Sequence, residues 1–399
     1  MQLALPGNPH LTYCTNIHAG ETWSDIETAL ADALPRVKAG ISPDRAMGVG
    51  LRLSAQAAEE LAAPAVRARF RRFLDEHDLY VFTVNAFPYG NFHGARVKER
   101  VYEPDWRTPE RLGFTCRVAD LLADLAPDGM EASISTVPGG FRTNIATAPD
   151  VARVAEGYAR AAAHLNGIRL RTGKTVTLAI EPEPACFLET TGEAVRFLED
   201  HLFRGPAAEL FARLAGIPAR EAEARLRRHV GLCFDVCHSA VAFEETIPML
   251  DAVHGAGIAI PKLQLSSALR ATGEAAHFER LLGRFDDGIY LHQTVERNGG
   301  TITRHLDLPD AFGAARRGEA GGEWRVHCHV PVFLDRFDAL EATQQNLRDA
   351  LALCRKRAVS PHLEVETYTW SVLPDGVKSP ELVGDIVREL AWVRTELGA

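Results

Sequence analysis

An aspartate and a histidine stand three residues apart in the segment Cys233-Phe-Asp-Val-Cys-His238. The apolar residues of 230–234 predict a short buried strand. Asp235 and His238 then follow the carboxyl end of this strand, where the chain turns into the next helix. A carboxylate and an imidazole in such a place are suitable ligands for a divalent metal ion. Asp235 could instead serve only as a helix cap, but the histidine in phase with it favours metal binding.

Two further predicted strands end in pairs of acids, Glu181 with Glu183 and Glu364 with Glu366. The two acids of each pair share one strand face, because side chains alternate along a strand. We expect Glu181 to act in a site rather than as a capping or surface acid. We expect Glu366 to face the site and Glu364 to lie deeper. Three separated strands that deliver acids and a histidine to one edge are typical of a (β/α)₈ barrel enzyme.

Other polar residues also follow predicted strands and could contact a substrate. Arg52, on a buried strand, needs an acidic partner or an anionic substrate nearby. His18 and His93 are loop histidines, which are more often solvated than functional. His327 and His329 share one strand face, so one of them can bind metal while the other lies behind it. The side chains that we expect to bind substrate are His18, Arg52, Asn85, His93, Lys262 and His327.

The elements that must position these residues alternate between apolar strands and amphipathic helices. The helical patterns lie near 22–39, 55–77, 108–126, 149–172, 190–228, 240–255, 337–357 and 379–397. The strands are short, continuous and apolar, as in a parallel sheet buried on both faces. They are predicted at Leu11–Ile17, Gly48–Leu53, Leu79–Asn85, Glu131–Thr136, Thr175–Ile180, Val230–Asp235, Ile258–Leu265 and Leu363–Thr367. Eight such units predict an α/β fold, a (β/α)₈ TIM barrel. A doubly wound open sheet is the alternative, but no GxGxxG motif follows the first strand.

The stretch from about 270 to 323 interrupts this alternation after the seventh strand. It is rich in glycine and charge, and it contains strand-like pieces at Tyr290–Val295 and Thr301–Leu308. The segment 324–333 reads as a further strand. Because the stretch shows no self-contained apolar pattern, we expect an inserted cover on the active-site side of the barrel. The chain 1–399 is then a single domain.

Composition excludes several classes of function. The chain has 399 residues, a formal net charge of −9 and no Lys/Arg cluster, which argues against nucleic acid as a partner. No charged-then-apolar leader or run of about 20 apolar residues occurs, so we expect a cytoplasmic protein that does not insert into a membrane. The seven cysteines form no CxxC pair, and we expect reduced thiols.

The acidic strand ends resemble those of xylose isomerase-like and endonuclease IV-like TIM barrels. Glu181-Pro-Glu-Pro resembles the Glu-Pro-Lys-Pro of xylose isomerases, and the Asp235 segment resembles the Cys-x-Asp-Thr-Cys-His of the endonuclease IV branch. Glu366-Thr resembles the final Glu-Thr ligand of that branch. Where the seventh strand of these proteins brings a histidine, this chain has Gln264, so that Gln264 or His329 would complete the site. The resemblance implies a divalent metal (Zn, Mn, Mg or Fe) held by Glu181, Asp235, His238, Gln264, His329 and Glu366.

Longer motifs resemble the E protein of the Ebo metabolite-traffic gene cluster, nearly from end to end. They are His10-Leu-Thr-Tyr-Cys-Thr-Asn-Ile-His18, Gly50-Leu-Arg-Leu-Ser-Ala, Val84-Asn-Ala-Phe-Pro-Tyr-Gly-Asn-Phe-His93, Lys262-Leu-Gln-Leu-Ser-Ser-Ala268, His327-Cys-His-Val-Pro and Leu363-Glu-Val-Glu-Thr-Tyr-Thr-Trp370. This resemblance implies a role in making or moving a small polyol-type or prenylated metabolite, with pathway proteins as possible partners.

Three functions are compatible with these residues. The first is a metal-dependent isomerase or epimerase, in which the metal polarises a carbonyl and Glu181 and Glu366 pass a proton. The second is a metal-dependent phosphoester hydrolase, which predicts two or three metals and more histidines than the sequence places at the site. The third is a carrier or scaffold that binds a small molecule without turnover.

Overall fold

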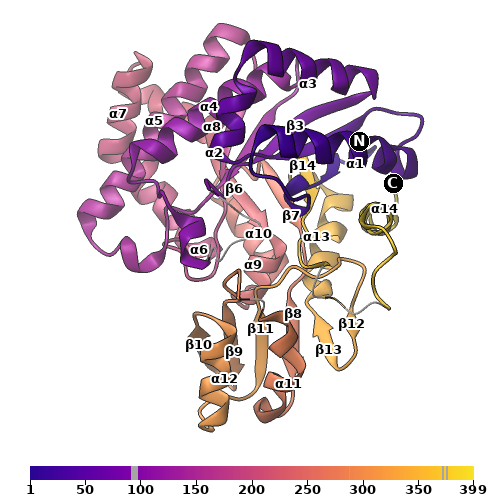
Figure 1. The fold of residues 1–399 in the computed structure, drawn as a ribbon. Coiled ribbons are helices and arrows are strands. Elements are labelled where there is room, and N and C mark those ends of the chain that lie inside the picture. The colour runs from indigo at the N-terminus through magenta and orange to yellow at the C-terminus, as the bar shows by residue number, and fades with distance from the viewer. Residues whose placement is uncertain (91–97, 287, 371–372, 374–375) are drawn as a thin grey trace.

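Eight parallel strands form the centre of the computed structural model, which describes residues 1–90, 98–286, 288–370, 373 and 376–399. The strands are β1 (His10–Tyr13), β2 (Met47–Arg52), β3 (Leu79–Asn85), β4 (Ala132–Thr136), β5 (Val176–Ile180), β6 (Val230–Asp235), β7 (Lys262–Leu265) and β14 (His362–Val365). Their order in the sheet is β1-β14-β7-β6-β5-β4-β3-β2. A parallel bridge between Cys14 and Gly50 brings β1 next to β2 and closes the ring. The structure confirms the predicted TIM barrel, with an insertion between its seventh and eighth strands (Figure 1).

The strand register aligns the polar ends of neighbouring strands. Asp235 on β6 pairs with Gln264 on β7, and Gln264 pairs with Glu364 on β14. All residues of β6, β7 and β14 are buried. Because the register is parallel, the residues that follow these pairs emerge together at one rim of the barrel.

The helices surround the barrel (Figure 1). They are α1 (Trp23–Ile41), α2 (Ala55–Leu61), α3 (Pro64–Glu76), α4 (Pro109–Leu125), α5 (Ala148–Thr172), α6 (Thr191–Phe197), α7 (Gly205–Ala215), α8 (Ala222–His229), α9 (Val236–Val241), α10 (Thr246–Gly255), α13 (Gln344–Lys356) and α14 (Leu382–Leu397). Short 3-10 and π-helical turns lie between them. Three of these helices begin with a threonine whose hydroxyl caps the first turn and an acid at the third helical position, the capping box of Thr22, Thr147 and Thr190. Among the described residues, the helices are too short or too polar to cross a membrane.

Several predicted elements differ from the observed ones for identifiable reasons. The helix expected at 55–77 is two helices, because Pro64 starts a new first turn. The strand expected from Ile258 begins only at Lys262, since Pro261 cannot donate a hydrogen bond to a neighbouring strand. The pattern at 190–228 is divided among α6, α7 and α8. The helix expected from 337 begins at Gln344, because the residues before it form two short strands.

The insertion, residues 269–342, folds into a second, six-stranded antiparallel sheet that projects from one end of the barrel (Figure 1). Its strands are β8 (Leu269–Thr272), β9 (Thr294–Asn298), β10 (Thr301–His305), β11 (Glu323–Val326), β12 (Arg336–Phe337) and β13 (Leu340–Ala342), with helices α11 (Phe278–Leu282) and α12 (Leu308–Arg316). We call residues 269–342 the extension. The strand expected over 324–333 ends at Val326, after which the chain returns toward the barrel rim.

The extension has an apolar core of its own, which the sequence pattern did not predict. Trp324 lies at its centre, fully buried, with Phe278 at 4.9 Å between ring centroids and Phe312 at 6.4 Å. Trp370 and Leu373, which follow the last barrel strand, belong to the same core. These two residues join the extension to the barrel.

Candidate metal centre

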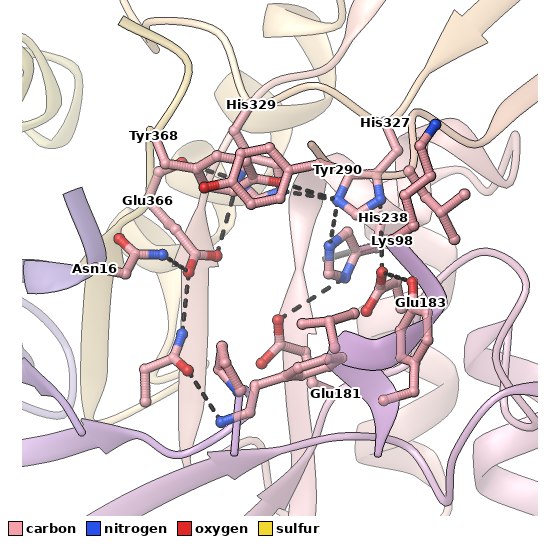
Figure 2. Close-up of a pocket in the computed structure, with 16 residues that line it drawn as sticks. Asn16, Lys98, Glu181, Glu183, His238, Tyr290, His327, His329, Glu366 and Tyr368 are labelled. Carbon is pink, nitrogen blue, oxygen red and sulfur yellow. Dashed lines mark hydrogen bonds and ion pairs between the residues drawn. The ribbon is translucent and has the colours of Figure 1, made fainter. Parts of the chain in front are cut away.

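A pocket opens where the carboxyl ends of the barrel strands meet the extension (Figure 2). Its described lining residues come from several strand ends and from the return of the extension. They are Asn16, Asn85, Phe87, Pro88, Lys98, Val101, Tyr102, Glu181, Glu183, His238, Tyr290, Leu291, His327, His329, Glu366 and Tyr368. This is the rim where TIM-barrel enzymes build their active sites.

Two carboxylates of this pocket, Glu181 and Glu366, converge with Asp235, which is not among the described lining residues. Glu181, Asp235 and Glu366 are buried, and each places one oxygen within 4.8 Å of the others. Asp235 Oδ1 accepts hydrogen bonds from the Ser266 hydroxyl and the His238 backbone N–H, both at 2.9 Å. Glu181 Oε2 and Asp235 Oδ2, in contrast, are buried without a hydrogen-bond partner. Buried carboxylate oxygens without donors are suited to binding a cation.

Burial and mutual repulsion disfavour three negative charges in this place. Burial raises the pKa of Glu181 well above its usual range, and the nearby Glu366 and Asp235 raise it further. The pKa of Glu366 is raised in the same way, by burial first and then by Asp235 and Glu364. A divalent cation at this point would neutralise the repulsion and let all three acids ionise.

Three histidines line the same pocket, and each has its Nδ1 atom beside a carbonyl oxygen. The acceptors are the Pro182 carbonyl for His238 at 3.0 Å, the Gln293 side chain for His327 at 2.7 Å and the Glu366 carbonyl for His329 at 3.0 Å. A carbonyl can only accept, so each Nδ1 carries the hydrogen and each Nε2 carries a lone pair.

These Nε2 atoms face one another. His238 Nε2 lies 3.0 Å from His327 Nε2, which lies 3.3 Å from His329 Nε2. Burial lowers the pKa of His238 to about 4 and lowers the pKa values of His327 and His329 as well, so protons do not hold the rings together at neutral pH. Converging neutral imidazoles fit a metal ion of the Zn²⁺ type.

The sets of side chains that could bind a metal overlap in their residues. Donor atoms of Asp235, His238 and His329 lie within 4.8 Å of one another, as do those of Cys237, His327 and His329. The geometry therefore fits the metal that the sequence resemblance implies. Asp235 belongs both to the group with Glu181 and Glu366 and to the group with His238 and His329, so it would be the ligand that the two groups share.

Gln264 has a different place from the one expected of a metal ligand. Its amide nitrogen donates to Glu366 Oε2 at 2.8 Å, while Asn16 and Asn85 donate to Glu366 Oε1 at 2.8 and 3.0 Å. Gln264 is fully buried, and its amide oxygen accepts a hydrogen bond from the Cys233 thiol at 3.1 Å. Three side-chain amides thus fix the position of Glu366. Asn16 was missed because an asparagine after a first strand, by itself, carries no signal for this role.

Lys262 lies below the pocket rather than in it. Its ammonium group is 2.8 Å from Glu364 Oε2, and both side chains are fully buried. A Cβ atom at Gly50 would stand 2.1 Å from Glu364 Oε1, so the pair depends on a glycine in β2. Lys262 and Glu364 therefore form a charge pair inside the barrel, beneath Glu366.

The structure does not bring His18 and Arg52 to the pocket's described lining. His18 Nε2 is 2.9 Å from the Tyr13 hydroxyl. Arg52 forms an ion pair with Glu21 at 2.9 Å and donates to the Gly20 carbonyl at 2.7 Å. The acidic partner that Arg52 requires is therefore supplied by the protein itself. His93 lies outside the described residues.

A second polar cluster lies on the opposite side of the pocket from Glu366 (Figure 2). Tyr102 donates its hydroxyl to Glu183 Oε1 at 2.7 Å, and the Gln293 amide donates to the Tyr102 oxygen at 2.7 Å. Burial raises the pKa of Glu183 to about 8, although both hydrogen-bond partners act in the opposite direction. His327 Nδ1 lies 3.6 Å from Glu183. Gln293 comes from the extension, and no feature of its sequence distinguished it.

The pocket also has apolar and aromatic lining residues, with one described cation. Its apolar side chains are Phe87, Pro88, Val101, Tyr290, Leu291 and Tyr368. The rings of Tyr290 and Tyr368 are 5.8 Å apart. The Lys98 ammonium group forms an ion pair with Asp307 of the extension. The pocket thus combines polar and apolar lining residues.

Neither a protein-family model nor a curated protein sequence matches the chain. Solved structures do match over nearly its whole length. An L-ribulose 3-epimerase is 12% identical, with a TM-score of 0.48, over 98% of this chain and 94% of that chain. A xylose isomerase domain protein from Planctomyces limnophilus is 12% identical, with a TM-score of 0.48, over 98% of both chains. The IOLI protein, solved with a bound zinc atom, is 12% identical, with a TM-score of 0.45, over 98% of both chains. These are likenesses of fold, and the site described above rests on the geometry of this chain.

Proposed function

We propose that this protein is a divalent-metal-dependent enzyme of the isomerase or epimerase type that acts on a small hydroxycarbonyl compound. The observation that carries the proposal is the pair of buried oxygens without partners, Glu181 Oε2 and Asp235 Oδ2, together with the group that Asp235 forms with His238 and His329. When bound, the metal would act as a Lewis acid toward neighbouring oxygens of the substrate.

The two catalytic acids have different surroundings and therefore different roles. Glu366 has both oxygens engaged by side-chain amides, which hold it in one position. Glu181 lines the same pocket, and its Oε1 atom lies 3.9 Å from His238 Nδ1, so no side-chain amide of the described residues holds it as Glu366 is held. Glu181 is thus the better placed of the two to accept a proton from a carbon next to a carbonyl and to return it on another face or atom. The buried setting keeps water away from this transfer.

The finer proposal concerns the metabolite. The motifs that resemble the Ebo-cluster E protein carry Asn16, Asn85, Gln264, His329 and Glu366, which all belong to this centre. Membership of that family remains a proposal, which this convergence supports. A polyol-type head suits the polar lining residues of the pocket, and a prenyl or other apolar group suits its apolar ones.

Proton transfer can be tested directly. The protein, loaded with Mn²⁺ or Zn²⁺, is incubated in D₂O with a panel of ketoses and ketopolyols, and NMR follows exchange at the carbon beside the carbonyl. We expect deuterium incorporation or epimer formation that Glu181→Gln abolishes. Metal binding without exchange in any compound would contradict an isomerase and favour the carrier.

The three converging histidines favour a second candidate, a phosphoester hydrolase with two metals. His327 supplies the additional imidazole that such a site needs. Metal content measured by mass spectrometry separates the possibilities. Two equivalents per chain, falling to one in His327→Phe, with hydrolysis of bis(p-nitrophenyl) phosphate, would support the hydrolase. Substoichiometric metal and no metal-induced thermal shift would favour the carrier.

A further inference from the structure

A buried glutamate on the last helix, Glu389 of α14, contacts two segments that lead away from the candidate metal centre. Its Oε1 atom accepts the Thr367 hydroxyl at 2.7 Å and the Val332 backbone N–H at 3.1 Å. Thr367 follows Glu366 directly, and Val332 lies three residues after His329. Glu389 is 3% exposed and does not line the pocket.

The same two segments are joined at other points. His329 Nδ1 donates to the Glu366 carbonyl at 3.0 Å, and the Thr369 hydroxyl donates to the His329 carbonyl. Segment 329–332 returns from the extension, whereas 366–369 leaves the last barrel strand. The relative position of a histidine and a glutamate of the centre therefore depends on how these two segments are held together.

Val332 is held from two outer helices at once. Its N–H donates to Glu389 of α14, and its carbonyl accepts from the Gln344 amide of α13 at 2.9 Å. Both backbone polar groups of this residue are thus satisfied by side chains. Leaving one of them buried without a partner is unfavourable, which would let the segment move.

We propose that Glu389 is a positioning residue that holds segments 329–332 and 366–369 in register. By doing so, Glu389 sets the affinity of the centre for metal, and this claim about affinity rests on the proposed metal-dependent function. Residues that orient metal ligands typically change metal affinity about 10–100-fold when removed. Glu389 acts through Thr367 and Val332 and touches no proposed ligand.

The chain offers matched variants for the test. Burial raises the pKa of Glu389 to about 8, so at neutral pH it is mainly an uncharged carboxyl group, which Gln resembles. Asp385 stands one turn earlier on α14, is also buried, and accepts the Ser379 N–H instead. Glu389→Leu removes the acceptor, Thr367→Val removes one donor, Glu389→Gln keeps the acceptor, and Asp385→Asn perturbs the same helix away from the centre.

The first measurement is hydrogen exchange of the metal-free protein, which does not depend on the proposed function. We expect faster exchange of segment 329–332 in Glu389→Leu, and unchanged exchange there in Glu389→Gln and Asp385→Asn. Unchanged exchange in Glu389→Leu, or equally faster exchange in Asp385→Asn, would overturn the positioning role.

The second measurement is the affinity for Mn²⁺ and Zn²⁺ by competition with a chromophoric chelator. We expect at least tenfold weaker binding in Glu389→Leu and Thr367→Val, and less than threefold change in Glu389→Gln and Asp385→Asn. Wild-type affinity in Glu389→Leu would overturn the link to the centre. A wild-type protein that binds no metal would refute the proposed function and that link, while the exchange result would still decide the positioning role.

Discussion

At the scale of single residues, the centre is defined by polar atoms that the protein buries but does not satisfy. Asp235 Oδ2 has no protein donor, and His238 Nε2 faces another Nε2 atom. A ligand that binds only the folded state stabilises it, by about 2.7 kcal/mol at a hundredfold excess over the dissociation constant. A metal ion should therefore raise the melting temperature of this protein.

Asp235→Asn and His238→Ala should each abolish that rise, because each removes one donor atom from the centre. Differential scanning calorimetry with and without Mn²⁺ or Zn²⁺ measures the effect. His18→Ala, whose side chain is not among the pocket's described lining residues, serves as the control and should keep the full rise. If both centre variants respond to metal like the wild type, these ligands are misassigned.

Glu366 and Glu364 should respond differently to the same substitution. Glu366→Gln keeps the volume but removes a charge at the pocket, so metal affinity or turnover should fall at least tenfold while the circular dichroism spectrum is preserved. Glu364→Gln leaves the Lys262 ammonium group buried without its counter-charge, which typically costs about 3–5 kcal/mol. Chemical denaturation and metal titration of both variants separate the two effects. Equal loss of metal affinity in both would contradict the assignment.

The positions of Glu181, Asp235 and His238 at the ends of predicted strands were sufficient to predict that these residues lie near one another. It could not find the partners of Arg52 and His18, because Glu21 and Tyr13 sit on segments whose approach depends on the folded rim. Nor could it show that Gln264 serves Glu366 with its amide, because a buried glutamine is compatible with either role.

At the scale of elements, the opposite end of the barrel is held by buried neutral histidines. His362, on β14, has Nδ1 2.7 Å from the Ser133 hydroxyl and Nε2 3.1 Å from the Glu131 carbonyl. Burial lowers its pKa to about 3, against about 6.5 in an unfolded chain. Between these two values only the unfolded state takes up the proton, so His362 lowers stability as the pH falls from about 6.5 toward 3.

Comparing the wild type with His362→Gln isolates this effect. The buried acids Glu183 and Glu389 have raised pKa values and change the stability with pH in the opposite direction, but they do so equally in the two proteins, so their contribution cancels. The stability advantage of the wild type should shrink by about 1.4 kcal/mol per pH unit below 6.5. Urea denaturation of metal-free protein from pH 7 to 5 measures it. A pH-independent difference would show that His362 is protonated in the folded state.

The alternation of apolar runs and helical patterns was enough to predict all eight barrel strands, since strands buried on both faces have a strong and continuous signal. Boundaries were less predictable where proline intervenes, as at Pro64 and Pro261. The insertion after the seventh strand was predicted, but its apolar core was not, because that core is drawn from short strands and helices spread from Leu269 to Leu373. No one stretch of its sequence has the period of a buried element.

At the scale of the whole molecule, the extension contributes directly to the pocket. It supplies Tyr290, Leu291, His327 and His329 to the lining, and its Asp307 pairs with Lys98 of the barrel loop. We propose that it works as a cover within one domain with the barrel, not as an independent unit.

Limited proteolysis tests this relation. We expect the first cuts within about 270–323, in its turns, and we expect Mn²⁺ or Zn²⁺ to slow them, because the metal would tie His329 to residues of the barrel. The variant Asp235→Asn should remove that protection. A proteolytic fragment of the extension that remains folded by itself would contradict the single-domain proposal.

The central claim is that Glu181, Asp235 and His238 hold a metal ion at the rim of the barrel. Anomalous diffraction from crystals grown with Mn²⁺ or Zn²⁺, recorded on both sides of the absorption edge, tests it most directly. We predict a peak about 2.0–2.5 Å from a carboxylate oxygen of Asp235, a carboxylate oxygen of Glu181 and a ring nitrogen of His238. A crystal whose protein carries stoichiometric metal with its peak elsewhere, or one that shows no peak at saturating metal, would contradict the account.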